Sequence, residues 1–159
     1  MSKIITHIEA LEKARSYCAY QERCQQEVIT KLKSFKLNAD EMDYVLLLLI
    51  QGNYLNEERF ARTYSSGKFR MKKWGKRKIK YQLKGKGLTD KCIELGLSEI
   101  DPEEYYTALE KLIDLKWEQS KEKIPYKKRS KISTYLYGRG FESNLINEIL
   151  DEKQKSTTP

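Results

Sequence analysis

Apolar residues recur at helical spacing along almost the whole chain, and no segment of more than a few residues keeps the strict alternation of a half-buried strand. This pattern predicts an all-α protein. Helix starts are marked by Asn38, which opens a capping box, by Asn56, and by Asp101, which a proline follows. Pro125 is expected to stop or kink the helix that begins after Asp101.

Three segments of the chain resemble one another: EVITKLKSFKLNADEM from Glu27, KIKYQLKGKGLTDKCI from Lys78 and KISTYLYGRGFESNLI from Lys131. Each has a β-branched residue and two apolar residues at matching positions, with a period of about fifty residues. Such a period is typical of stacked helical repeats, whose units bury apolar faces against their neighbours. We therefore expect about nine helices in three tandem three-helix repeats that form an elongated, curved helical array. The expected parts are residues 1–55, the basic 56–100 and 101–150, followed by a disordered tail at 151–159.

The middle helix of each repeat is predicted to end at a turn of recognisable chemistry. Gly87 and Gly140 stand where the chain would enter the left-handed conformation that closes a helix. Lys36 occupies the same place in the first repeat. We expect the turn at Lys36 to be strained or differently built.

Helical spacing also predicts which side chains are buried. The run VLLLLI at 45–50 is predicted to be the most buried helix segment of the first repeat. Further core residues are predicted at Phe60, Tyr64, Met71, Tyr106, Leu109, Ile113 and Trp117. For Tyr81, packing is favoured over stacking on nucleic-acid bases, whereas for Trp74 the two roles are evenly balanced.

The chain has 159 residues and a net charge of +8, and its basic residues are unevenly placed. Ten lysines and arginines and no acidic residue lie between Lys68 and Lys86. Like charges at helical spacing destabilise an isolated helix by about 0.2–0.5 kcal/mol per pair, so an anionic partner explains the run better than a solvated face does. A second basic cluster, YKKRSK at 126–131, lies about one repeat further on. The predicted nucleic-acid or partner contacts are Lys72, Lys73, Trp74, Lys76, Arg77, Lys80, Lys84, Lys86, Lys127, Lys128, Arg129, Lys131 and Arg139.

Little in the sequence favours catalysis, a metal or a cofactor. His7 is the sole histidine, and the three cysteines form no C-x-x-C pair. The glycines of GKGL end a helix instead of opening one after a strand, so they do not form a phosphate-binding loop. No apolar run approaches the length of a membrane-spanning helix or a signal-peptide core. We expect a cytoplasmic, monomeric binding protein that is not an enzyme, carries no metal or cofactor and has no membrane partner.

Three stretches together resemble the RecX regulatory protein family, known as modulators of the RecA recombinase. GNYLNEERFA at 52–61 is similar to the family's joint between its first and second repeats. The segment WGKRKIKYQLKGKGL at 74–88 resembles the second-repeat pattern, and SKISTYLYGRGF at 130–141 resembles the closing segment of the third. The first repeat departs most, because ERCQQEVITKLKSFKL replaces a short arginine-rich helix.

The resemblance implies a non-enzymatic regulator of DNA repair, DNA recombination and the SOS response. Such a protein would bind in the groove of the RecA recombinase filament and modulate its ATPase and strand exchange, with inhibition the expected direction. Non-specific, weak binding to single- and double-stranded DNA through the basic helices would accompany this activity. Two alternatives stay open at this point: a general nucleic-acid-binding helical-repeat protein without a recombinase partner, and a scaffold whose basic face meets an acidic protein.

Overall fold

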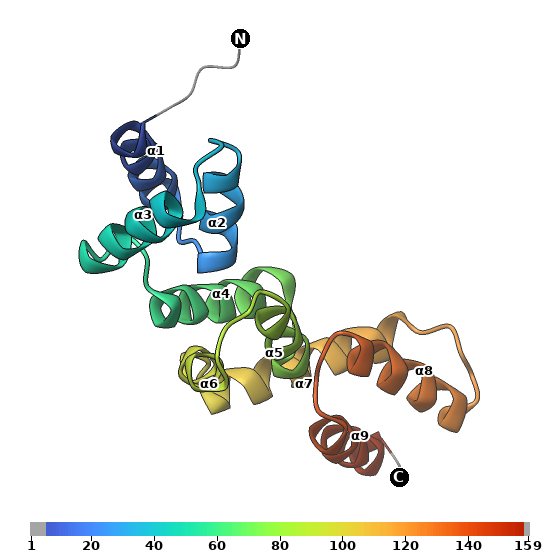
Figure 1. Ribbon diagram of the computed structural model, residues 1–159. Helices are drawn as coiled ribbons and strands as arrows, with labels where there is room; N and C mark the ends of the chain where they lie inside the picture. Colours follow the sequence, from blue (N-terminus) through green and yellow to red (C-terminus); the bar gives the residue numbers. More distant parts are fainter. Residues whose placement is uncertain (1–5, 158–159) are drawn as a thin grey trace. The chain divides into compact units, whose positions relative to one another are not determined.

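The computed structural model describes residues 6–157, which fold into nine α-helices with no strand among them (Figure 1). The prediction of an all-α protein is confirmed. The helices are α1 (His7–Tyr20), α2 (Gln25–Lys33), α3 (Ala39–Gln51), α4 (Glu57–Lys72), α5 (Lys76–Gly85), α6 (Asp90–Leu97), α7 (Pro102–Gln119), α8 (Pro125–Gly138) and α9 (Ser143–Thr157).

The helix starts follow the capping residues of the sequence. The Asn38 side chain accepts a hydrogen bond from the Glu41 N–H at 2.8 Å, and the Glu41 carboxylate accepts one from the Asn38 N–H at 3.1 Å. Asn56 and Asp101 cap α4 and α7 in the same way, at 2.9 Å and 3.0 Å. Each side chain thus satisfies a backbone donor that has no partner inside its helix.

Two predictions at the third repeat are wrong. Pro125 neither stops nor kinks α7, which ends at Gln119; it is instead the first residue of α8, where a proline loses no intrahelical hydrogen bond. The predicted disordered tail continues α9 as far as Thr157, because Arg129 of α8 binds Asp151 and Lys153 binds α7. Residues 158–159 lie outside the described part of the chain.

The helices fall into two compact units. The first unit contains the described residues up to Thr63 together with Leu83–Gly96, and the second contains Tyr64–Gln82 together with the described residues from Leu97. Helices α1–α3 contact one another within the first unit, and α7–α9 do so within the second. The divisions fall inside α4, α5 and α6, so the middle third of the chain contributes to both units.

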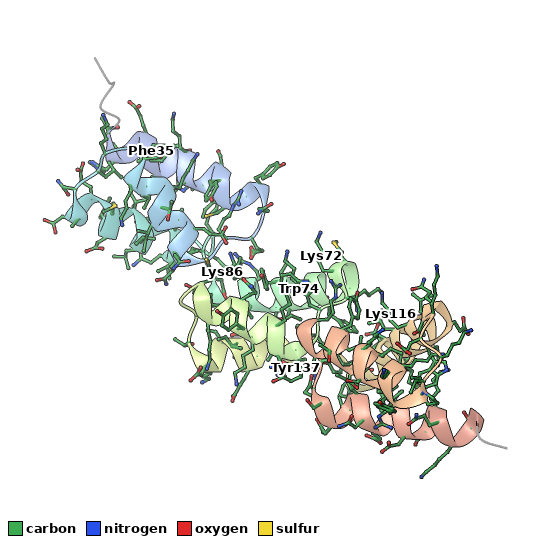
Figure 2. The ribbon with its side chains drawn as sticks, turned by 90° about the vertical axis from the view of Figure 1, so that its right-hand side faces the viewer. Phe35, Lys72, Trp74, Lys86, Lys116 and Tyr137 are labelled. Atoms are coloured by element: carbon green, nitrogen blue, oxygen red, sulfur yellow. The ribbon has the colours of Figure 1, made fainter. Side chains whose placement is uncertain are left out.

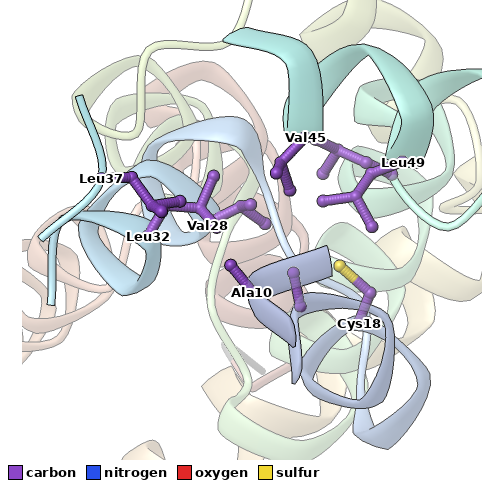
Figure 3. Close-up of a cluster of buried hydrophobic side chains, with 9 residues drawn as sticks. Ala10, Cys18, Val28, Leu32, Leu37, Val45 and Leu49 are labelled. Carbon is purple, nitrogen blue, oxygen red and sulfur yellow. The ribbon is translucent and has the colours of Figure 1, made fainter. Parts of the chain in front are cut away.

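The core of the first unit forms where α1, α2 and α3 meet (Figure 3). Its buried side chains are Ala10, Ala14, Cys18, Val28, Leu32, Leu37, Val45, Leu49 and Leu55. Cys18 is a packed apolar residue, and its burial raises the pKa of the thiol. Gly96 of α6 lies so close to α4 that an added Cβ would come within 2.6 Å of the Ala61 Cβ.

The turn after α2 is built with a lysine in the left-handed conformation. Lys36 has φ 59°, whereas Gly87 and Gly140 take up φ 83° and 100° at the corresponding turns. The predicted strain at Lys36 is therefore confirmed, since the left-handed conformation costs an L-residue about 1–2 kcal/mol that glycine avoids.

Replacing Lys36 by glycine is expected to raise the free energy of unfolding of the first unit by about 0.5–1 kcal/mol, because the relief of strain exceeds the entropy that glycine loses on folding. Urea unfolding followed by circular dichroism measures the change. Lys33→Gly, on the last residue of α2, is the control and should destabilise instead. If Lys36→Gly and Lys33→Gly lowered the free energy of unfolding equally, the strain at Lys36 would be contradicted.

Helical spacing alone assigned several apolar side chains wrongly. Met71 was predicted to be core and is 84% exposed, and Tyr81, for which packing was favoured, is 75% exposed. Within VLLLLI, Val45 and Leu49 are buried but Leu47 is half-exposed. Phe60, Leu109 and Ile113 are buried as predicted, while Tyr64, Tyr106 and Trp117 are partly buried.

Candidate nucleic-acid and partner interface

The connection between α4 and α5 packs against the end of α8 within the second unit. The Gly75 N–H donates to the Arg139 carbonyl at 2.8 Å, and the Arg77 N–H donates to the Gly140 carbonyl at 2.9 Å. A Cβ on Gly75 would lie 2.2 Å from the Gly140 carbonyl carbon, so only glycine permits this approach. Backbone contacts therefore fix the basic segment against the third repeat.

Tyr105 of α7 lies at the centre of this junction. Its buried hydroxyl accepts a hydrogen bond from the Lys76 N–H at 3.0 Å and donates one to the Glu142 carboxylate. Burial, and then the bond to Glu142, raise the pKa of Tyr105 well above its usual range, so the phenol stays neutral. The ammonium group of Lys76 lies 4.8 Å from the centre of the Tyr105 ring. Lys76 is thus half-buried against the junction.

Both arginines of the junction are held by contacts within the second unit. The Arg77 guanidinium stacks 3.9 Å from the centre of the Tyr137 ring and donates to the Tyr137 carbonyl at 3.2 Å. Arg139 donates to the carbonyl of Lys72 at the end of α4. These contacts bring the end of α8 beside the α4–α5 connection and fix two positive charges there.

Trp74 is half-buried, and cations lie close to its ring. The ammonium groups of Lys68 and Lys78 are 5.0 Å and 4.6 Å from the ring centre, and the Tyr64 ring meets it edge-on at 6.5 Å. A base stacking on Trp74 would compete with these lysines for the ring. The geometry therefore favours packing, the first of the two roles open for this residue.

Three lysines of the basic segment project into solvent. Lys72, Lys73 and Lys80 are exposed, and none has a side-chain hydrogen bond, ion pair or ring contact within residues 6–157. Figure 2 shows Lys72, at the end of α4, near Trp74 of the α4–α5 connection. Lys73 itself has φ 56°, in the left-handed region, at the end of α4. We call Lys72, Lys73 and Lys80 the free lysines.

The second predicted cluster, on the first half of α8, is mostly engaged. Lys128 lies 4.3 Å from the Trp117 ring centre, and Arg129 donates at 2.6 Å both to Asp151 and to Gln154. Lys131 binds Glu122 at 2.8 Å, and this bond lowers the pKa of Glu122. Lys127 is exposed and has no such side-chain partner in the described chain. The cluster contributes fewer available charges than its sequence indicates.

The last two predicted residues belong to the first unit and are paired there. Lys84 lies 3.7 Å from the Asp90 carboxylate, and Lys86 lies 3.5 Å from Glu27. Exposed pairs of this kind are worth about 0–1 kcal/mol, so an anionic partner can compete for Lys84.

The predicted residues are thus of two kinds. The structure brings Lys72, Lys73, Arg77 and Arg139 together around one junction, whereas Lys127 lies at the other end of α8, about 18 Å from Arg139 at the helical rise. Sequence reasoning missed the tyrosines that fix the arginines, although the closing turn YGRGF places an aromatic residue two positions before Arg139.

Within residues 6–157, no group of three or more histidine, cysteine, aspartate or glutamate side chains is placed to hold a metal ion. The helices of this described part are also too short or too polar for any of them to traverse a bilayer.

The helices and the basic junction define an all-α helical-repeat protein with a cationic surface on its second unit. Sequence models of the second and third three-helix domains of RecX match residues 56–97 and 103–150. The chain belongs to the RecX family of regulatory proteins. The resemblance of its motifs is therefore confirmed.

Individual relatives agree with this assignment. The chain is 34% identical over 146 residues to the regulatory protein RecX of Prosthecochloris aestuarii, covering 91% of this chain and 93% of that protein. It is 33% identical to the RecX of Lactobacillus gasseri, where it covers 90% of this chain but only 53% of the relative. The crystal structure of RecX from Lactobacillus salivarius has the same fold, with a TM-score of 0.84, 24% identity, and coverage of 92% and 95% of the two chains.

Proposed function

We propose that this protein binds RecA–DNA filaments and inhibits the recombinase ATPase and strand exchange, using its basic junction to contact DNA phosphates. The observation that carries the proposal is that Lys72 and Lys73 are exposed and have no side-chain partner within residues 6–157, next to the fixed guanidinium groups of Arg77 and Arg139. Lys80, one turn beyond Arg77 in α5, is exposed in the same way. Membership of the RecX family supports the recombinase as the partner.

Phosphate contacts of this kind fix position without reading the bases. Lysine side chains are flexible point charges that contact phosphates without reading base edges. Lys72 ends α4, Lys73 lies in the α4–α5 connection and Lys80 lies within α5. The protein alone should therefore bind both single- and double-stranded DNA weakly, with little sequence preference and with a steep dependence on salt.

The test is a variant in which the free lysines become glutamine. Three fewer neutralised phosphates should lower the affinity for single-stranded DNA by about tenfold or more at low salt, and should make the slope of log affinity against log salt less steep by about 2. The same variant should inhibit the RecA ATPase on single-stranded DNA much less strongly than the wild type does. Lys76 and Arg77 are left unchanged because both hold the junction together.

The matched control replaces three exposed lysines away from the junction with glutamine. Lys121, Lys123 and Lys155 serve, since each is exposed and lies in the second unit. For the control, the slope of log affinity against log salt should match that of the wild type to within about the contribution of one phosphate contact. Equal ATPase inhibition by the wild type and the free-lysine variant, both folded by circular dichroism, would show that the junction does not face DNA in the filament.

The two remaining functions make different predictions. A general nucleic-acid-binding protein would bind DNA with the same salt dependence but would leave the recombinase ATPase unchanged once free DNA is in excess. A scaffold for an acidic protein would retain its partner after nuclease treatment. The family assignment favours the recombinase regulator over both.

A further inference from the structure

The first unit carries an apolar stripe on the outer side of α3. Tyr44 and Leu47 are each 51% exposed, Ile50 is 46% exposed and Ile8 is 65% exposed. The three α3 residues are spaced by three positions and therefore share one side of the helix. The His7 ring of α1 meets the Tyr44 ring edge-on at 5.7 Å, so the start of α1 borders this side of α3. We call Tyr44, Leu47 and Ile50 the α3 stripe.

The stripe is not a part of the core that happens to be loosely packed. The opposite side of α3 supplies Val45 and Leu49 to the core of the first unit, and both are fully buried. Single exposed apolar residues are ordinary on a protein surface, but an apolar stripe that extends along a helix is typical of an interaction site.

Charge distinguishes the α3 stripe from the basic junction. Helix α3 carries Asp40, Glu41 and Asp43 and no lysine or arginine, in a chain whose net charge is +8. Asp40 and Asp43 are exposed at the edge of the stripe. Phosphates would be repelled from such a surface, while a protein surface of apolar side chains bordered by lysine or arginine would complement it.

We propose that the α3 stripe is a protein-docking surface, and that its occupant is a subunit of the recombinase filament that presents apolar side chains with a basic rim. The inference rests on the proposed function, from which it takes the identity of the partner. On this proposal the two units contact different partners. The second unit contacts DNA through lysines, and the first unit contacts protein through the α3 stripe.

The double variant Leu47→Gln with Ile50→Gln tests this division. Both changes lie on the exposed side of α3 and leave Val45 and Leu49 in place, so the helix is retained. Binding to RecA without DNA should fall by about tenfold or more, because two apolar anchors are lost. Binding of the same variant to free single-stranded DNA should equal that of the wild type. Asp43→Lys should also weaken RecA binding, and more so at low salt.

Leu115→Gln with Ile124→Gln is the matched control, since it makes the same chemical change at two exposed positions of the second unit. It should leave RecA binding unchanged. If the wild type binds RecA and the Leu47/Ile50 variant binds it equally well, the docking surface is wrong while the proposed function stands. If the wild type neither binds RecA nor alters its ATPase, the proposed function fails first. A wild type that sediments as a dimer, with the variant monomeric, would assign the stripe to a second copy of this chain and overturn the inference.

Discussion

Replacing Gly75 by alanine is expected to lower the free energy of unfolding of the second unit by about 3–5 kcal/mol. The added Cβ would lie 2.2 Å from the Gly140 carbonyl carbon and 2.3 Å from the Phe141 nitrogen. Neither atom is a flexible side-chain end that could move aside. The backbones must separate, and the hydrogen bonds from Gly75 and Arg77 to the α8 turn are lost together.

Amide hydrogen exchange measures this effect separately in each unit. Protection should fall in α7–α9 and stay unchanged in α1–α3, because the clash lies entirely within the second unit. Gly67→Ala is the matched control: it lies within α4, nothing is within 4 Å of its added Cβ, and it should stabilise α4 by about 0.5–1 kcal/mol. Unchanged protection of α7–α9 in the Gly75 variant would mean that the junction is more open than described.

The local features of the fold were predictable from the sequence because their causes are local. Capping side chains such as Asn38 and Asp101 bind backbone groups three residues away. The left-handed turns at Gly87 and Gly140 need a residue without a Cβ, and the lysine that replaces glycine at position 36 was predicted to be strained for the same reason. Each of these inferences depends on a few residues that are close together in the sequence.

Which basic side chains are free to contact a partner could not be predicted in the same way. Whether Arg77 is free depends on Tyr137, and whether Arg139 is free depends on the carbonyl of Lys72, 67 positions away in the chain. Helical spacing likewise placed Met71 and Tyr81 on an apolar pattern, but no neighbouring helix covers either side chain. Periodicity shows which residues share a face; it does not show what covers that face.

In this protein, a run of basic residues in the sequence therefore does not by itself define a binding surface. Of the residues predicted to contact a partner, Arg77 and Arg139 build the junction. Lys72, Lys73, Lys80 and Lys127 are exposed and have no side-chain partner within residues 6–157. A charge-reversal variant that included Lys76 or Arg77 would lose stability and binding at once. Function has to be tested at the free lysines and stability at the junction.

Tyr105→Phe tests the junction without changing its shape. The variant removes one hydroxyl, which leaves the Lys76 N–H without its acceptor and the Glu142 carboxylate without its donor. The free energy of unfolding should fall by about 1–3 kcal/mol, the cost of leaving such groups unsatisfied. Tyr135→Phe, on the exposed surface of α8, is the control and should change stability by less than about 0.5 kcal/mol.

The pH dependence of this difference reports the state of the phenol. Because burial raises the pKa of Tyr105 in the folded protein, its contribution is fully present below the unfolded pKa of about 10. Above that pH the unfolded phenol ionises while the folded one stays neutral, so wild type should lose stability relative to Tyr105→Phe as pH rises. Comparing the two proteins cancels the lysines, which titrate in the same range in both. If the difference in free energy of unfolding between wild type and Tyr105→Phe stayed constant from pH 8 to pH 11, the Tyr105 hydroxyl would be in contact with water. Its bond to Glu142 would then be a surface contact.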